Sequence, residues 1–170
     1  MSNAIEVVDR TGSEQARAPV IALVEAVLRA EKAGGAVTVA FVGEREMTEL
    51  NDRFRGLPEP TDVLSFRYAD GDGEWPESPG TEPGAAGADG EGQPAPDLGE
   101  VIVCTAVVDR YAREEGTCLG VQLAWTLVHG VLHLVGYDHE EDDGEMRRRE
   151  RDLLEELGPL VHAFASSQDC

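Results

Sequence analysis

Residues 129–139 read HGVLHLVGYDH and hold three of the four histidines of the chain. His129 and His133 are four residues apart, so on a helix their side chains lie on one face. Gly136 predicts the end of that helix, because glycine readily adopts the left-handed backbone of a C-terminal turn. The turn can bring His139 back toward the pair. Three histidines of this kind predict a zinc site whose fourth position is open to water, as in catalytic zinc proteins.

The residues around the histidines predict a buried helix over 121–135. Two histidines at this spacing often lie on a protein surface without binding a metal ion. Histidines in a buried helix, however, need a metal ion or hydrogen-bond partners. We therefore expect one zinc ion per chain, bound by His129, His133 and His139. The apolar residues that surround the pair are Trp125, Leu127, Val128, Val131, Leu132, Leu134 and Val135.

Gly130 restricts the chemistry that such a site predicts. Zinc proteases of the H-E-x-x-H type carry a glutamate directly after the first histidine, where it acts as the general base. Gly130 occupies that position here. The spacing therefore favours metal-assisted hydrolysis but argues against the commonest zinc peptidase chemistry.

The remaining sequence predicts an α+β fold. Alternating apolar residues indicate strands, and apolar residues at i, i+3 and i+4 indicate helices. We expect a mixed four-stranded sheet packed with about five helices, in one zinc-hydrolase-like domain of residues 1–170. Thr105 is the expected N-cap of the third helix. The expected strands cover residues 5–9, 36–42, 62–68 and 100–104, and the expected helices cover 19–33, 44–55, 106–115, 121–135 and 144–157.

Residues 70–97 interrupt this pattern. The segment holds seven glycines, five prolines and eight acidic side chains, with no basic residue and almost no large apolar side chain except Trp75. Such a composition cannot bury enough surface to offset the entropy of ordering. We predict a disordered acidic insertion rather than a second domain.

The overall charge conflicts with binding to nucleic acid. Lys and Arg number 14 against 34 Asp and Glu, a net charge of −20, whereas phosphate binding favours a basic surface. Much of the acidic charge lies in residues 70–97 and 138–156, so a local basic patch is compatible with it. No apolar run is long enough to span a membrane and no signal segment is evident, which predicts a cytoplasmic protein with reduced cysteines.

Three blocks of the sequence resemble the YbeY family, bacterial endoribonucleases also called rRNA maturation factors. The histidine segment is similar to the family signature H-G-x-L-H-L-x-G-Y-D-H. Asn51, Phe54 and Arg55, followed by PTDVLSF at 60–66, and LGEVIVC at 98–104 are similar to two further family blocks. The resemblance covers roughly residues 5–160. The departures are the acidic insertion, Glu100 in place of aspartate and Arg67 in place of a frequent proline.

The resemblance implies a zinc-dependent endoribonuclease specific for single strands. It implies action in rRNA maturation, at the 3′ end of 16S rRNA, and in ribosome quality control. The implied partners are single-stranded RNA or rRNA and the ribosome or its small subunit, with no membrane. It also implies a catalytic role on RNA for Arg55. Taken alone, Arg55 is an ordinary helix-end arginine that complements the helix dipole, although a guanidinium can also hold a phosphate with two hydrogen bonds.

Several alternatives remain open at this point. Asp138 could orient a ligand histidine or cap the turn after Gly136, and Glu100 could act as a weak base or be a solvated carboxylate. His162 is expected to be a local histidine of an apolar tail rather than a fourth ligand. The rival functions are a zinc hydrolase of another substrate class and a non-catalytic ribosome-assembly factor stabilised by zinc. The sequence does not indicate the oligomeric state.

Overall fold

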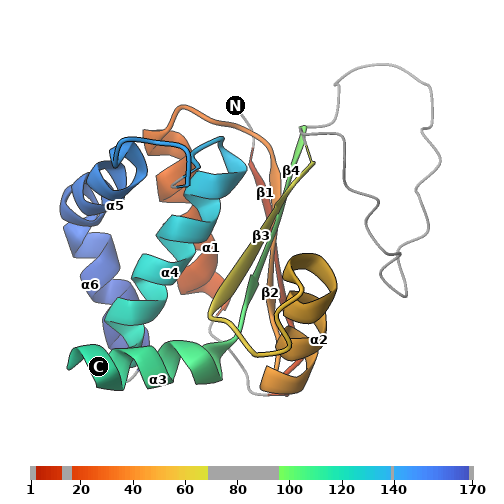
Figure 1. The fold of residues 1–170 in the computed structure, drawn as a ribbon. Helices are drawn as coiled ribbons and strands as arrows, with labels where there is room; N and C mark the ends of the chain where they lie inside the picture. Colours follow the sequence, from red (N-terminus) through yellow and green to blue (C-terminus); the bar gives the residue numbers. More distant parts are fainter. Residues whose placement is uncertain (1–2, 13–16, 69–95, 139, 169–170) are drawn as a thin grey trace.

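The computed structural model of the chain describes residues 3–12, 17–68, 96–138 and 140–168. Within these residues it contains a mixed four-stranded sheet and six helices, so the predicted α+β class is confirmed (Figure 1). The strands are β1 (Ala4–Asp9), β2 (Ala36–Phe41), β3 (Val63–Arg67) and β4 (Asp97–Val103). The helices are α1 (Arg17–Ala30), α2 (Glu44–Arg55), α3 (Thr105–Glu115), α4 (Leu119–Leu134), α5 (Glu145–Glu156) and α6 (Gly158–Ser167).

The sheet has the order β1-β2-β4-β3. β1 pairs with β2 and β2 with β4 in parallel, while β3 runs antiparallel to β4, with Ser65 opposite Val101. Figure 1 shows α1, α4, α5 and α6 on one side of the sheet and α2 on the other. β3 is therefore an edge strand that lies between α2 and α4.

The two faces of the sheet bury separate sets of side chains, because successive residues of a strand point to opposite faces. In β4, Val101 and Val103 belong to the large core that includes the α4 side chains. Ile102 belongs to a smaller core with Met47 of α2. A strand residue can therefore be assigned to the α4 face or the α2 face by its register.

Helix α4 lies at the centre of the large core. It contacts α1, α3, α5, α6, β3 and β4, and Leu123, Leu127 and Val131 are almost fully buried. At Gly130 an added Cβ would lie 2.6 Å from Val101 Cγ1. Ser65 Oγ donates a hydrogen bond of 3.0 Å to the Gly130 carbonyl oxygen. The helix thus packs so closely on the sheet that no side chain fits at the position where zinc proteases carry their glutamate.

Several boundaries differ from the sequence-based expectations. β4 begins at Asp97 rather than at residue 100, so the predicted insertion of residues 70–97 ends too late, and residues 69–95 lie outside the described part of the chain. Helix α6 was not predicted. Thr105 is the first residue of α3 rather than its cap, because Cys104 is the N-cap residue and makes no side-chain cap hydrogen bond.

The cysteines also differ in part from expectation. Cys104 is free and buried. Cys118 is disulfide-bonded, so the prediction of reduced cysteines is wrong for this residue.

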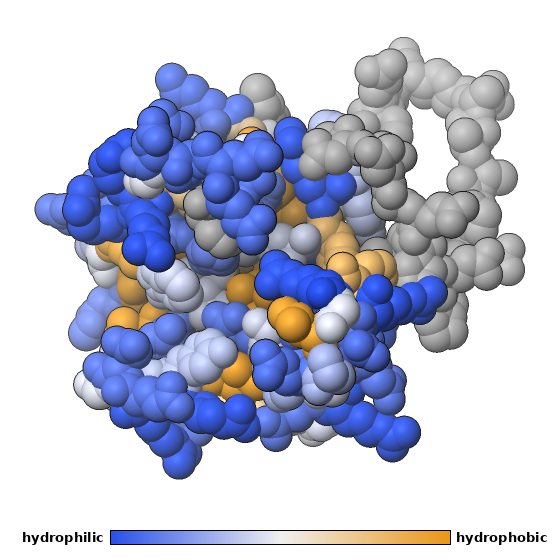
Figure 2. Space-filling model, in the orientation of Figure 1, coloured by the Kyte–Doolittle hydropathy of each residue, from blue (hydrophilic) through white to orange (hydrophobic). Residues whose placement is uncertain are grey.

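Within the described ranges, no single helix is long and apolar enough to cross a membrane, and only α3 and α4 taken together across a 116° bend meet the length and composition criteria. Most of the surface facing the viewer in Figure 2 is hydrophilic, with small apolar areas between.

Candidate active site

The histidine pair of α4 converges on one point. The Nε2 atoms of His129 and His133 are 3.2 Å apart, and the two rings meet edge to face with centroids 4.8 Å apart. The His129 side chain is only 17% exposed. Its ring also stacks on the indole of Trp125 one turn earlier. The four-residue spacing therefore places both imidazoles on one face of the helix.

Both Nδ1 atoms of the pair face hydrogen-bond acceptors. His129 Nδ1 contacts the carboxylate of Glu150 on α5, whose side chain is 5% exposed. His133 Nδ1 lies 3.0 Å from the carbonyl oxygen of Tyr137. A carboxylate and a carbonyl accept but do not donate, so both Nδ1 atoms carry the proton in the neutral rings. The Nε2 lone pairs then face one another, an arrangement that a cation stabilises.

The spacing of the two Nε2 atoms fits a tetrahedral zinc ion. With Zn–N bonds of 2.0–2.1 Å, two ligand nitrogens of such a site are about 3.3 Å apart, close to the observed 3.2 Å. The third predicted ligand, His139, lies outside the described residues. Among the residues that are described, no group of three or more His, Cys, Asp or Glu side chains is placed to hold a metal ion. Zinc binding by His129, His133 and His139 therefore stays a prediction.

Glu150 is the site residue that sequence reasoning missed. In the sequence it stands among the α5 arginines as one of several acidic neighbours, yet it is 4% exposed. A signal for it does exist in the sequence. Met146, Glu150 and Leu153 are the buried residues of α5, at the i, i+4 and i+7 positions of one helix face. A carboxylate in the middle of an apolar stripe indicates a buried polar partner.

The other acidic candidates lie elsewhere. Asp138 Oδ1 accepts a 3.0 Å hydrogen bond from the backbone N–H of Glu140, which is a turn contact, and the acceptors that orient the histidines are Glu150 and Tyr137. Glu100 lies between Gly99 and Val101, so it points to the α2 face, away from the histidines. Burial raises the pKa of the Glu100 carboxyl, and the Tyr68 hydroxyl donates to it at 3.5 Å.

His162 is exposed on α6, where its carbonyl oxygen accepts a hydrogen bond from Ser166. This position agrees with the expectation of a local histidine.

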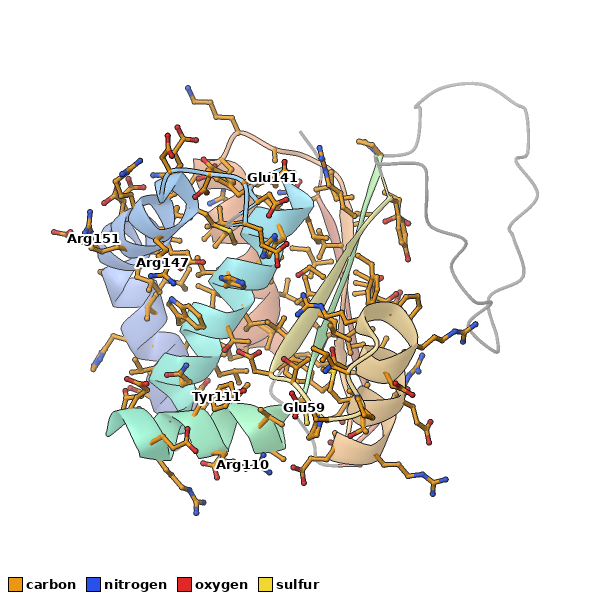
Figure 3. All side chains as sticks on the ribbon, in the orientation of Figure 1. Glu59, Arg110, Tyr111, Glu141, Arg147 and Arg151 are labelled. Atoms are coloured by element: carbon orange, nitrogen blue, oxygen red, sulfur yellow. The ribbon has the colours of Figure 1, made fainter. Side chains whose placement is uncertain are left out.

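A cleft of about 780 Å³ opens at His133, and Arg55 lines it as well. The structure thus brings together a helix-end arginine and a histidine that are far apart in the sequence. The loop after α2, where Glu59 is labelled, and the loop after α4, where Glu141 is labelled, can be found in Figure 3. The described residues that line the cleft are Arg55, Leu57, Ser65, Arg67, His133, Gly136, Tyr137, Asp138 and Glu140.

Two neighbours of Arg55 determine its position. The Phe54 ring packs against Phe66 of β3 with centroids 4.8 Å apart, which fixes the end of α2 on the edge strand. Asn51 is 3% exposed and its Nδ2 donates a 2.8 Å hydrogen bond to the Glu59 carbonyl oxygen, which holds the following loop. Asn51 therefore holds the loop after α2 and Phe54 holds the end of the helix. Of these three residues, only Arg55 lines the cleft.

Comparison with known proteins agrees with these features. The family model described as Endoribonuclease YbeY matches residues 3–158. The chain belongs to the YbeY family. The resemblance found in the three sequence blocks is thereby confirmed.

Individual YbeY relatives support the same assignment. The endoribonucleases YbeY of Pseudomonas entomophila and of Pseudomonas putida strain F1 are each 38% identical over 136 residues, which cover 79% of this chain and 75% of the relative. The solution structure of TM1509 from Thermotoga maritima is similar with a TM-score of 0.58 and 28% identity, over 95% of each chain.

Proposed function

We propose that the protein is a zinc-dependent endoribonuclease of the cytoplasm that cuts single-stranded RNA. We further propose that it acts in rRNA maturation, at the 3′ end of 16S rRNA, and in ribosome quality control. Membership of the YbeY family and the names of the relatives support the RNA substrate. The observation that carries the proposal is the pair of converging Nε2 atoms, 3.2 Å apart, beside a cleft that also holds Arg55.

In this proposal, three histidines bind the metal ion and two further residues orient the histidine rings. His129, His133 and His139 would hold zinc, which when bound acts as a Lewis acid and lowers the pKa of coordinated water to about 7. Glu150 and the Tyr137 carbonyl keep the two described imidazoles in the tautomer that presents Nε2. Because Gly130 has no room for a side chain, this arrangement provides no glutamate base of the protease kind.

Arg55 supplies the positive charge on the substrate side. Arg55 lines the same cleft as His133, and a guanidinium can donate two hydrogen bonds to one phosphate. Charge builds on the phosphate oxygens as the phosphodiester bond breaks, and a fixed guanidinium stabilises that charge. The volume of about 780 Å³ lies in the range of sites for small ligands and favours a few unpaired nucleotides over a duplex.

Zinc content and RNA cleavage, measured on the same preparations, test the proposal. Wild type should hold about one zinc per chain and cut a labelled single strand but not the matching duplex. His133→Ala should lose most of the zinc and the activity. His162→Ala is the matched control, because this histidine is exposed on α6 and is not among the residues that line the cleft, and it should behave as wild type.

Two outcomes would replace the proposal. If zinc-loaded wild type leaves single-stranded RNA intact but cuts peptides or small esters, the protein is a hydrolase of another class. If it cuts nothing but binds the small ribosomal subunit only with zinc present, it is a non-catalytic assembly factor. The rRNA role is tested separately by mapping 16S rRNA 3′ ends in cells depleted of the protein, where unprocessed ends should accumulate.

A further inference from the structure

Arg67, the last residue of β3, lies on the wall of the same cleft as Arg55 and His133. Ser65 bonds to the Gly130 carbonyl of α4, and strand alternation puts Arg67 on the same face as Ser65. The guanidinium atoms of Arg67 lie 3.5–3.7 Å from where a Cβ on Gly136 would be. Arg67 therefore reaches the turn that directly follows the histidine helix.

The charge of the cleft depends on this residue. Among its described lining residues, Arg55 and Arg67 balance Asp138 and Glu140. Without Arg67 the same set would be net negative and would oppose a phosphate.

The neighbouring clefts are acidic. A cleft of about 530 Å³ that Gly136 also lines has no basic residue among its described lining residues. The same holds for a cleft of about 560 Å³ beside Trp125. Of these three clefts, only the one at His133 has basic residues among its described lining residues, Arg55 and Arg67. The acidic residues of the first cleft are Glu31, Asp138, Glu141, Asp142 and Glu145, and those of the second are Asp62, Glu114 and Glu115.

Other arginines lie on α3 and α5. Arg110 belongs to α3 and Arg149 to α5. Figure 3 labels Arg147 and Arg151 on α5, which Figure 1 shows across α4 from β3. None of these residues lines the cleft at His133.

We propose that Arg67 is a second phosphate-binding residue of the cleft and that it sets the affinity of this chain for RNA. This inference rests on the proposed endoribonuclease function. Arg55 and Arg67 extend from the end of a helix and the end of an edge strand, and both elements are fixed by the Phe54–Phe66 contact. Two guanidiniums on a rigid wall hold the sugar–phosphate backbone without reading bases, which suits binding that does not depend on sequence.

Paired substitutions at Arg67 test the inference. Arg67→Gln removes the charge, Arg67→Lys keeps it, and Arg45→Gln is the matched control, since Arg45 is 94% exposed on α2 and does not line the cleft. We expect Arg67→Gln to raise KM and the Kd for labelled single-stranded RNA about tenfold while kcat changes less than about twofold, because the arginine binds the RNA backbone and not the reacting atoms.

Salt dependence separates phosphate binding from a structural role. When one phosphate of a single strand is no longer neutralised by the protein, the slope of log affinity against log salt falls by about 0.7. Arg67→Gln should show this reduction, whereas Arg67→Lys and Arg45→Gln should keep the wild-type slope.

The inference would be overturned if Arg67→Gln bound RNA with the same affinity and the same salt slope as Arg45→Gln. It would also be overturned if Arg67→Gln bound RNA more weakly but kept the wild-type salt slope. Failure of wild type to cut RNA would instead overturn the proposed function, and the Kd measurements would still decide the role of Arg67.

Discussion

Removal of the Glu150 carboxylate should weaken zinc binding without removing any ligand. Glu150 approaches the site from α5 and contacts His129 Nδ1, while His129 Nε2 faces the Nε2 of His133. Glu150→Ala takes away the acceptor that fixes the tautomer and the orientation of this ring. The ring can then rotate or exchange its proton between the two nitrogens, and each change costs metal affinity.

The size of the effect follows from the hydrogen bond between Glu150 and His129. A hydrogen bond to a charged group contributes about 1.5–3 kcal/mol, and removal of a residue that orients a metal ligand weakens metal binding about 10–100-fold. The Glu150 side chain is only 5% exposed, so solvent compensates little and the upper part of the range is expected. Glu150→Gln keeps an acceptor oxygen but loses the negative charge, and we expect about a tenfold loss.

Competition with a chromophoric chelator at constant pH measures the zinc Kd of each variant. Glu155→Ala is the matched control, because it removes the same charge from an exposed position of α5. Circular dichroism confirms that every variant is folded before its zinc affinity is compared. A folded Glu150→Ala protein whose zinc Kd lies within twofold of wild type would refute the role of this carboxylate.

Three further predictions follow from other parts of the fold. Gly130→Ala should lower the free energy of unfolding in urea by about 1–3 kcal/mol through overpacking, because the new Cβ would lie 2.6 Å from Val101 Cγ1. Gly158→Ala is the control, since its Cβ has open space, and it should change the free energy of unfolding by less than about 0.5 kcal/mol. Equal changes in the two variants would disprove the close packing at Gly130. Arg55→Glu should slow RNA cleavage at least about tenfold, or 1.4 kcal/mol, while the zinc content stays unchanged. The rate of Arg55→Lys should lie between those of wild type and Arg55→Glu. A wild-type rate in Arg55→Glu would exclude a catalytic role for Arg55. Partial burial raises the pKa of Tyr68 to about 12, so an ultraviolet titration should show a tyrosinate transition near pH 12 that Tyr68→Phe abolishes. Because the folded pKa exceeds the ordinary value of about 10, the stability that the neutral phenol contributes should be present below pH 10 and lost between about pH 10 and pH 12; a last transition near pH 10 would contradict this.

Periodicity in the sequence predicted most of the helices and strands, and the reason is local. Spacing of apolar residues reports which face of an element is buried, and His129 and His133 were brought together by the same 3.6-residue repeat. Helix α6 was not predicted because it is short and begins with Gly158 and Pro159, two residue types that usually mark the end of a helix. Its Phe164 is nonetheless 1% exposed, and only the packing against α1 and α4 explains why this segment is helical.

The cleft could not be predicted in the same way, because it depends on strand order. Arg55 and Arg67 meet His133 only because β3 follows β4 at the edge of the sheet. The spacing of Arg55, Arg67 and His133 in the chain does not indicate the strand order, and neither does the composition around them. Glu150 was missed for a related reason, since its partner His129 belongs to another helix.

The contact between His129 and Glu150 also has a consequence for the time at which the site is completed. A ribosome makes the chain from the N-terminus, so the two histidines of α4 are made before α5. Until Glu150 has been made and α5 has docked on α4, the imidazole of His129 lacks the carboxylate that aligns it. A nascent chain therefore carries the two proposed ligand histidines before they are arranged for metal. For a protein that cuts RNA, this delay keeps the site incomplete through most of the time that the chain is held on a ribosome.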